Sequence, residues 1–128
     1  MYRNKVHIRH EERRGTRRQA EQVVGDLLQA RFATGNRVLT AVGGPGGTGK
    51  SSFCQKLADL LPDARVLRLD DYKTPREQRR ENNLFGPHPD ANHMALIRDH
   101  LASLRDGKTI QKPVYNAESG RADQKEAY

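Results

Sequence analysis

Residues 38–51 read Val38-Leu39-Thr40-Ala41-Val42-Gly43-Gly44-Pro45-Gly46-Gly47-Thr48-Gly49-Lys50-Ser51, and this stretch decides the fold. An apolar, β-prone run leads into a glycine-rich turn that ends on Gly-Lys-Ser. From Gly44 to Ser51 the turn fits the phosphate-binding pattern G-x-x-x-x-G-K-[ST]. The apolar run predicts a strand over residues 37–42, and the periodicity after the turn predicts a helix over residues 50–61. We therefore predict a strand–loop–helix unit over residues 37–61.

The glycine-rich turn predicts a cradle for the phosphates of a nucleotide. Glycines allow the backbone to fold around an anion with several N–H groups pointing inward. The N-terminus of the following helix adds its positive dipole end, Lys50 can reach the terminal phosphates, and the Ser51 hydroxyl can ligate Mg²⁺. The predicted nucleotide-binding residues are Gly44, Gly46, Gly47, Thr48, Gly49, Lys50, Ser51 and Ser52. The alternative is a glycine-rich turn that precedes a lysine by chance.

Size and composition predict one well-solvated domain or part of one. The chain has 128 residues, of which 34% are hydrophobic and 30% are charged, enough for a single core. Its one cysteine, Cys54, excludes an internal disulfide and a cysteine-based zinc site. No apolar run approaches the length of a membrane span, and no signal-peptide apolar segment follows the start. We therefore expect no membrane partner and a cytoplasmic protein.

The net charge of +7 is concentrated at the N-terminus. Residues 1–18 contain seven Lys and Arg against Glu11 and Glu12, which accounts for five of the seven positive charges. Residues 1–15 show no sustained period, and we predict a basic flexible arm there. A nucleic-acid partner would depend on this arm alone, and such runs are more often solvated termini. The sequence therefore does not favour a nucleic-acid partner.

A second predicted strand, residues 64–69, ends directly before Asp70 and Asp71. Two strands joined by one helix form a parallel, right-handed βαβ unit. The two carboxylates would then lie at the carboxyl end of the second strand, the same end at which the glycine-rich turn follows the first. Ligands of open α/β sheets bind in that crevice. The alternative is that the carboxylates cap the start of the next helix.

Apolar spacing and capping residues predict three more helices, over residues 16–34 (with its stop signal at 34–36), 74–81 and 91–105. In the second of these, Thr74 is the predicted N-cap and Pro75 the first helical residue. Gly107 is the predicted C-cap of the third. Residues 108–116 predict short extended pieces, and the polar residues 118–128 support no prediction.

Several motifs, in order along residues 38–126, resemble the phosphoribulokinase/uridine kinase family of P-loop small-molecule kinases. The matching stretches are Gly43–Phe53, Leu67-Arg68-Leu69-Asp70-Asp71-Tyr72, His88-Pro89-Asp90-Ala91-Asn92 and Lys112-Pro113-Val114-Tyr115-Asn116. The resemblance implies an α/β fold of the P-loop NTPase type, a three-layer sandwich around a parallel sheet. It also implies ATP and Mg²⁺ as cofactors, and residues 16–128 as the N-terminal part of a kinase domain.

The resemblance implies a role for each matched residue. Asp70 would accept the proton of the substrate hydroxyl and, with Ser51, hold Mg²⁺, while Lys50 would act on the transferred phosphate. Tyr115 would line the acceptor pocket. Asp71 is the second candidate of the aspartate pair, after Asp70, and would belong to the substrate site. Arg76, together with Arg79 and Arg80, would bind a substrate phosphate. The alternatives are an ordinary half-buried tyrosine and a solvated basic helix face, which the sequence favours for the arginines.

The sequence restricts the identity of the acceptor substrate but does not determine it. Asn116, Gly120, Asp123 and Glu126 resemble the corresponding run of phosphoribulokinases more than that of nucleoside kinases. Pro87 stands where nucleoside kinases carry an acidic residue that holds the ribose. The resemblance therefore implies ATP-dependent phosphorylation of a hydroxyl of a nucleoside, such as uridine, or of a sugar phosphate, such as ribulose 5-phosphate, with uridine placed in doubt.

Parts of a complete P-loop kinase are not recognisable after Tyr115, namely further parallel strands, a second acidic strand end and an arginine-bearing lid. We expect a C-terminally truncated domain that binds ATP weakly and transfers phosphate poorly on its own. The alternative functions are a non-catalytic ATP- or GTP-binding regulatory module and an inactive fragment of such a kinase. The sequence leaves open whether the chain forms a homo-oligomer.

Overall fold

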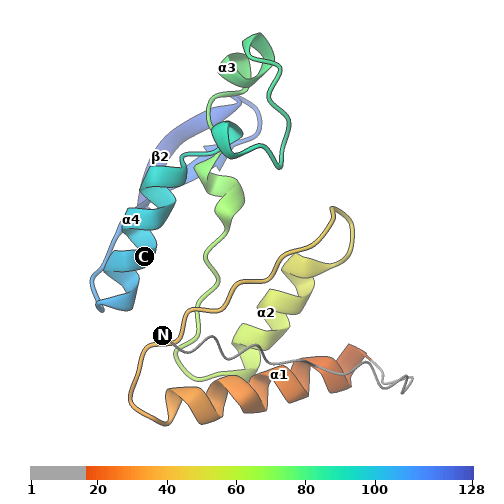
Figure 1. Cartoon of the computed structure of the whole chain (residues 1–128), viewed down its shortest axis with the longest axis vertical. Helices are drawn as coiled ribbons and strands as arrows, with labels where there is room; N and C mark the ends of the chain where they lie inside the picture. Colours follow the sequence, from red (N-terminus) through yellow and green to blue (C-terminus); the bar gives the residue numbers. More distant parts are fainter. Residues whose placement is uncertain (1–16) are drawn as a thin grey trace, which may run out of the picture.

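The computed structural model describes residues 17–128, and the predicted basic arm, residues 1–15, lies outside them. The elements in chain order are the helices α1 (Arg17–Phe32) and α2 (Lys50–Leu60), the 3₁₀ turn η1 (Leu69–Tyr72), α3 (Arg76–Glu81), the 3₁₀ turn η2 (Pro89–Ala91), α4 (Met94–Arg105), and the strands β1 (Gln111–Asn116) and β2 (Arg121–Ala127). Figure 1 shows two groups of elements. We call residues 17–60 the loop half and residues 69–128 the hairpin half; residues 61–68 join them.

The loop half is built on the packing of α1 against α2. Gly25 of α1 faces α2, since a Cβ there would lie in ordinary van der Waals contact, 3.8 Å from Cδ1 of the buried Leu57. The predicted leading helix is confirmed. It ends where the Thr34 hydroxyl donates to the Arg31 carbonyl at 2.7 Å and Gly35 adopts a φ of 81°, a left-handed conformation that suits glycine.

The two predicted parallel strands are wrong for the described residues. Residues 37–42 and 64–68 are extended but carry no ladder hydrogen bonds, and residue 69 already belongs to η1. Across residues 17–128 the sheet has two strands, β1 and β2, which pair antiparallel. An extended run becomes a strand only when a neighbour takes up its N–H and C=O groups, and here the two runs do not pair. The α/β class holds, whereas the parallel three-layer sandwich is not confirmed.

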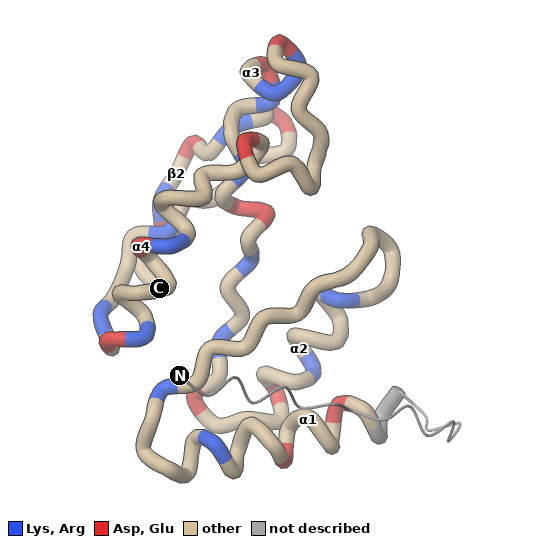
Figure 2. The backbone as a smooth tube through the Cα atoms, in the orientation of Figure 1, with Lys and Arg blue, Asp and Glu red and all other residues tan. Residues whose placement is uncertain are grey.

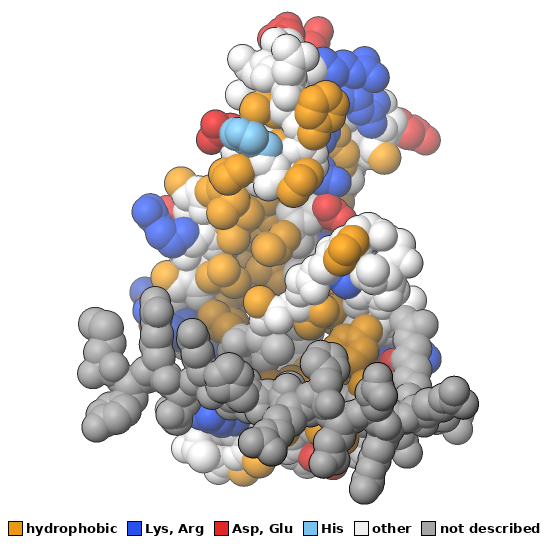
Figure 3. All heavy atoms as spheres, turned by 45° about the vertical axis from the view of Figure 1, so that its right-hand side comes forward, with side chains coloured by type: hydrophobic (Ala, Val, Ile, Leu, Met, Phe, Trp, Pro, Cys, Tyr) orange, Lys and Arg blue, Asp and Glu red, His pale blue; other side chains and the backbone are white. Residues whose placement is uncertain are grey.

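The unpaired runs leave apolar side chains in contact with solvent. Val38, Leu39 and Val42 are between 37% and 50% exposed. Figure 3 shows hydrophobic side chains gathered over the middle of one face, in the region between the two halves. The described helices include none that is both long and apolar enough to cross a membrane.

The hairpin half contains most of the buried core of the described residues. Its most buried side chains are Tyr72, Thr74, Ala91, Ile97, Ile110 and Lys112. Tyr72 is fully buried, its hydroxyl lies 2.8 Å from Nδ1 of His100, and the two rings meet edge to face at 5.6 Å. This contact joins η1 to α4 and fixes the start of the hairpin half.

Two helix boundaries differ from the prediction for identifiable reasons. Thr74 does not cap α3, because its hydroxyl donates to the Ala91 carbonyl at 3.1 Å. α4 begins at Met94 and not at residue 91, because Pro89–Ala91 forms η2. The predicted end of α4 is confirmed, with Gly107 at a φ of 80°.

The β1–β2 hairpin gives structure to a tail for which the sequence supported no prediction. Lys112 pairs with Glu126 in the register, and a bulge lies between Val114 and Tyr115. All seven residues of β2 are exposed, so the strand lacks the apolar alternation by which strands are recognised. Figure 2 shows acidic and basic positions interspersed along both halves.

Candidate active site

The phosphate loop, residues 43–51, forms a tight turn at the N-terminus of α2. Gly47 and Gly49 have φ values of 76° and 83°, left-handed conformations that other residues adopt only with strain. The Thr48 hydroxyl donates to the Pro45 carbonyl at 2.8 Å, and Nζ of Lys50 donates to the same oxygen at 2.6 Å. The lysine side chain therefore folds back over the loop, and its ammonium group is hydrogen-bonded to the loop backbone.

The first turn of α2 presents two hydroxyl groups beside this loop. Ser51 and Ser52 follow Lys50 directly and are exposed, and the first turn carries no acidic residue. The unpaired N–H groups at a helix N-terminus and the helix dipole both favour a bound anion. Loop, lysine and helix end thus offer donors and positive charge to the same small region.

Asp70 lies on η1 with its side chain 86% exposed, and its Oδ1 is 3.0 Å from Nζ of Lys73. Buried Tyr72 anchors the same turn through its contact with His100. The carboxylate therefore projects from an anchored turn into solvent. In Figure 1 the phosphate loop and η1 lie at about the same height along the long axis of the molecule, in different halves.

Asp71 is placed quite differently from its neighbour. Its side chain is 17% exposed, Oδ2 accepts from Nζ of Lys112 at 2.9 Å, and Oδ1 accepts from the backbone N–H of Tyr115 at 3.3 Å. Lys112 also contacts Oε1 of Glu126 at 2.6 Å. Burial opposes the charge of Lys112, but its hydrogen bonds to Glu126 and Asp71 outweigh that effect and hold the pKa of the amine above its ordinary value.

Tyr115 lies against the arginines of α3. Nη2 of Arg79 donates to the Tyr115 hydroxyl at 2.6 Å, and the guanidinium lies 5.6 Å from the ring centre. Arg76 donates from its side chain to the Ala117 carbonyl and from its backbone to the Gly120 carbonyl, while Arg80 is exposed. The solvated helix face that the sequence favoured therefore describes Arg80, whereas Arg76 and Arg79 pack against the hairpin.

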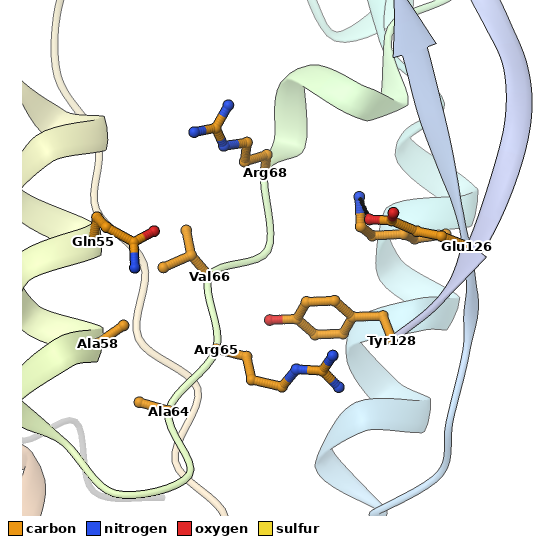
Figure 4. A pocket seen from close by; sticks show the side chains of 9 residues that line it. Gln55, Ala58, Ala64, Arg65, Val66, Arg68, Glu126 and Tyr128 are labelled. Carbon is orange, nitrogen blue, oxygen red and sulfur yellow. Dashed lines mark ion pairs between the residues drawn. The ribbon is translucent and has the colours of Figure 1, made fainter.

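The structure thus brings the predicted site residues together in two groups. Asp70, Asp71, Arg76 and Tyr115 belong to the hairpin half, and the phosphate loop belongs to the loop half. An open cavity of about 370 Å³ lies between α2, residues 64–68 and the hairpin, lined by Gln55, Ala58, Ala64, Arg65, Val66, Arg68, Lys112, Glu126 and Tyr128 (Figure 4). Its lining contains none of the predicted site residues.

Comparison with known proteins places this sequence in a family. The model of the phosphoribulokinase / uridine kinase family matches residues 39–128. The chain belongs to this family. The matched region begins just before the phosphate loop and includes every predicted site residue, whereas α1 precedes it. The resemblance inferred from the separate motifs is thereby confirmed.

Individual relatives include proteins with different printed activities. A phosphoribulokinase of Synechocystis sp. is 37% identical over 89 residues, which are 67% of this chain and 27% of that protein. A uridine kinase of Clostridium botulinum is 32% identical over 89 residues, 64% of this chain and 42% of that protein. An inorganic pyrophosphatase of Arabidopsis thaliana is 28% identical over 82 residues, 64% of this chain and 12% of that protein. The chain therefore spans less than half the length of these curated relatives.

The sequence missed the residues that hold this family site together across long distances in the chain. His100 carried no pattern of its own, Lys112 was noted only as part of the Lys-Pro-Val-Tyr-Asn segment, and Glu126 was noted only as part of the run that resembles phosphoribulokinases. The one available signal for these contacts was the pair of adjacent aspartates. If one carboxylate faces a ligand, the other turns toward the fold and needs a cation as its partner there. Nothing in the sequence indicated which lysine would supply that cation.

Proposed function

We propose that this chain supplies the nucleotide-binding and acceptor-orienting part of an ATP-dependent phosphotransferase that phosphorylates a hydroxyl of a small metabolite. The observation that carries the proposal is the phosphate loop, in which two left-handed glycines and the folded-back Lys50 surround the N-terminus of α2. Phosphoryl transfer needs positioning and charge neutralisation far more than covalent chemistry from the protein. A loop of this construction supplies both to a nucleoside triphosphate.

In this proposal each group of the site has one task. The N–H groups of Gly44 and of residues 46–49, together with the ammonium of Lys50, hold the β- and γ-phosphates. Asp70 accepts the proton of the attacking hydroxyl, and its exposed carboxylate is free of the buried contacts that engage Asp71. Tyr115 and Arg79 form one wall for the acceptor. Lys73, whose Nζ lies 3.0 Å from Oδ1 of Asp70, pairs with that carboxylate at the edge of the site.

Magnesium suits the donors of this site. Within residues 17–128 no cluster of three or more His, Cys, Asp or Glu side chains could enclose a metal ion. Mg²⁺, however, is held by one or two protein oxygens together with water and substrate phosphates. Ser51 and Asp70 offer a hydroxyl and an exposed carboxylate of this kind. Bound there with ATP, the ion would neutralise charge on the phosphates.

The acceptor that we propose carries a phosphate group of its own. Arg76 and Arg79 lie beside Tyr115 and the β1–β2 turn, and guanidinium groups recognise phosphate through paired hydrogen bonds. Asn116, the last residue of β1, donates to Asp123 at 3.0 Å. A sugar phosphate such as ribulose 5-phosphate fits this basic wall better than an uncharged nucleoside such as uridine.

The test is ATP consumption by the purified chain with a panel of acceptors: uridine, cytidine, ribulose 5-phosphate and pantothenate. We expect Lys50→Ala to weaken ATP binding, measured by calorimetry, by about 10²-fold because the loop loses its only side-chain cation for the phosphates. Lys56→Ala, on the same helix and 56% exposed, is the matched control and should bind ATP normally. Unchanged affinity in Lys50→Ala would rule out the phosphate loop as the nucleotide site.

Turnover tests the assignment of Asp70. Asp70→Asn should reduce phosphate transfer by about 10²-fold or more while ATP affinity stays within a factor of about two. The asparagine keeps the size of the side chain and cannot accept the proton. Full turnover in Asp70→Asn would remove the aspartate from the reaction.

A second candidate function is a non-catalytic ATP- or GTP-binding regulatory module. The observation that favours it is the separation of the phosphate loop and Asp70 into different halves, joined by the extended residues 61–68. Tight nucleotide binding that depends on Lys50, with no acceptor supporting turnover and no effect of Asp70→Asn, would identify this module.

A further inference from the structure

The two adjacent aspartates of η1 have opposite surroundings, which indicates that they have different tasks. The Asp70 side chain is 86% exposed and the Asp71 side chain 17% exposed. We call Asp71, Lys112 and Glu126 the Lys112 cluster. The cluster joins η1 to the β1–β2 hairpin, and its member Asp71 directly follows Asp70 in the chain.

The Lys112 cluster ties η1 to β1 at two points. One carboxylate, that of Asp71, accepts from Nζ of Lys112 with one oxygen and from the backbone N–H of Tyr115 with the other. Lys112 and Tyr115 lie three residues apart on β1, with the bulge between Val114 and Tyr115. A carboxylate held at both oxygens by one strand cannot rotate without losing a hydrogen bond.

Lys112, at the centre of the cluster, is buried and therefore needs its carboxylate partners. The Lys112 side chain is 8% exposed, and an ammonium group so far from water must be paired. Its partners are Asp71 at 2.9 Å and Glu126 at 2.6 Å, the latter 55% exposed. Figure 4 shows the Glu126 contact across the hairpin. Loss of Asp71 would leave the lysine only the partner on β2, which does not touch η1.

We propose that Asp71 and Lys112 are positioning residues that fix the direction of the Asp70 carboxylate relative to the acceptor wall formed by Tyr115. This inference rests on the proposed function, in which Asp70 takes the proton of the acceptor. The same Asp71 side chain contacts the backbone of Tyr115 and precedes Tyr72, whose ring is buried. Asp70 therefore directly precedes two anchored residues, the paired Asp71 and the buried Tyr72.

Backbone order parameters from NMR test the positioning role without requiring turnover. In Lys112→Met and in Asp71→Asn we expect the order parameter of Asp70 to fall from about 0.85 to below about 0.6, while those of α4 stay near the rigid value. Asp71→Asn keeps an oxygen for the Tyr115 N–H, so it stands as the milder variant if Lys112→Met does not fold. Glu126→Gln is the matched control, because it removes a negative charge beside Lys112 without touching η1, and Asp70 should stay rigid.

Kinetics of the same variants separate this inference from the proposed function. Lys112→Met and Asp71→Asn should lower kcat by about 10- to 100-fold with the KM for ATP within a factor of about two, because misplaced reacting groups cost rate. A rigid Asp70 in both variants, or wild-type kcat where Asp70→Asn is inactive, would overturn the positioning role. Full turnover in Asp70→Asn would instead refute the proposed function and leave the measured rigidity of η1 standing.

Discussion

The loop half and the hairpin half use their polar groups over very different distances along the chain. In the phosphate loop, Thr48 and Lys50 both donate to the carbonyl of Pro45, three and five residues away. In the hairpin half, Asp71 is joined to Lys112 across 41 residues and to Tyr115 across 44. A site made by neighbours in sequence can be recognised as a motif. A site made by tertiary contacts has no motif of its own.

The halves also differ in burial. The loop half buries Leu57 where α2 packs against α1, and it leaves Val38 and Leu39 37% and 50% exposed. The hairpin half encloses a fully buried Tyr72 that contacts His100. We therefore expect mutations of similar chemistry to have larger effects in the hairpin half.

The largest effect that we expect on stability comes from Tyr72→Ala. It removes a fully buried ring and its hydrogen bond to His100, which should lower the free energy of unfolding by about 3–5 kcal/mol. Urea denaturation measures this change, and Tyr72→Phe, which loses only the hydroxyl, should cost about 1 kcal/mol. Amide exchange should show α4 losing protection while the α1–α2 pair keeps it. Equal loss in both helix pairs would show that the halves unfold as one unit.

A smaller difference in stability between the halves should appear when two glycines of similar backbone conformation are replaced. Gly120 has a φ of 73°, and a Cβ there would lie 2.9 Å from Cβ of Arg76, whereas Gly35 has a φ of 81° with nothing within 4 Å. Gly120→Ala should lower the free energy of unfolding by roughly 2–3 kcal/mol and Gly35→Ala by roughly 1 kcal/mol. Thermal or urea unfolding of the two variants gives the comparison. Equal losses would mean that the hairpin yields to the added methyl group.

Much of the loop half could be predicted from the sequence because its determinants are local. The helix of residues 17–32, the glycine stop at Gly35 and the Gly44–Ser51 loop follow from periodicity and turn chemistry. The strand at residues 37–42 was predicted from its apolar, β-prone residues and is not formed in the described residues. Such residues indicate an extended backbone, but they do not say which strand will hydrogen-bond to it.

The hairpin half shows the complementary limit. Its buried Tyr72 follows the predicted Asp-Asp pair, yet the sequence could not say that Asp70 would be exposed and Asp71 half-buried. That division depends on Lys112, which reaches η1 only because β1 packs against it. β2 was missed because all its residues are exposed, so backbone pairing with β1, and not an apolar face, defines the strand.

The smallest effect is a loss of stability at high pH that should be specific to the hairpin half. Burial raises the pKa of Tyr72 above its ordinary value of 10.0, and the pKa of Lys112 lies above 10.5. Between the ordinary and the raised values the folded chain keeps protons that the unfolded chain releases, so rising pH favours unfolding. Stability should therefore hold up to about pH 10 and fall above it, measured by urea midpoints from about pH 8 to about pH 11. Tyr72→Phe, which cannot ionise at this position, should show a shallower fall of stability with pH. Lys112→Met should also make the fall shallower, because it removes the second group with a raised pKa. A profile of Tyr72→Phe parallel to that of the unmodified chain would show that ionisation elsewhere controls the alkaline transition.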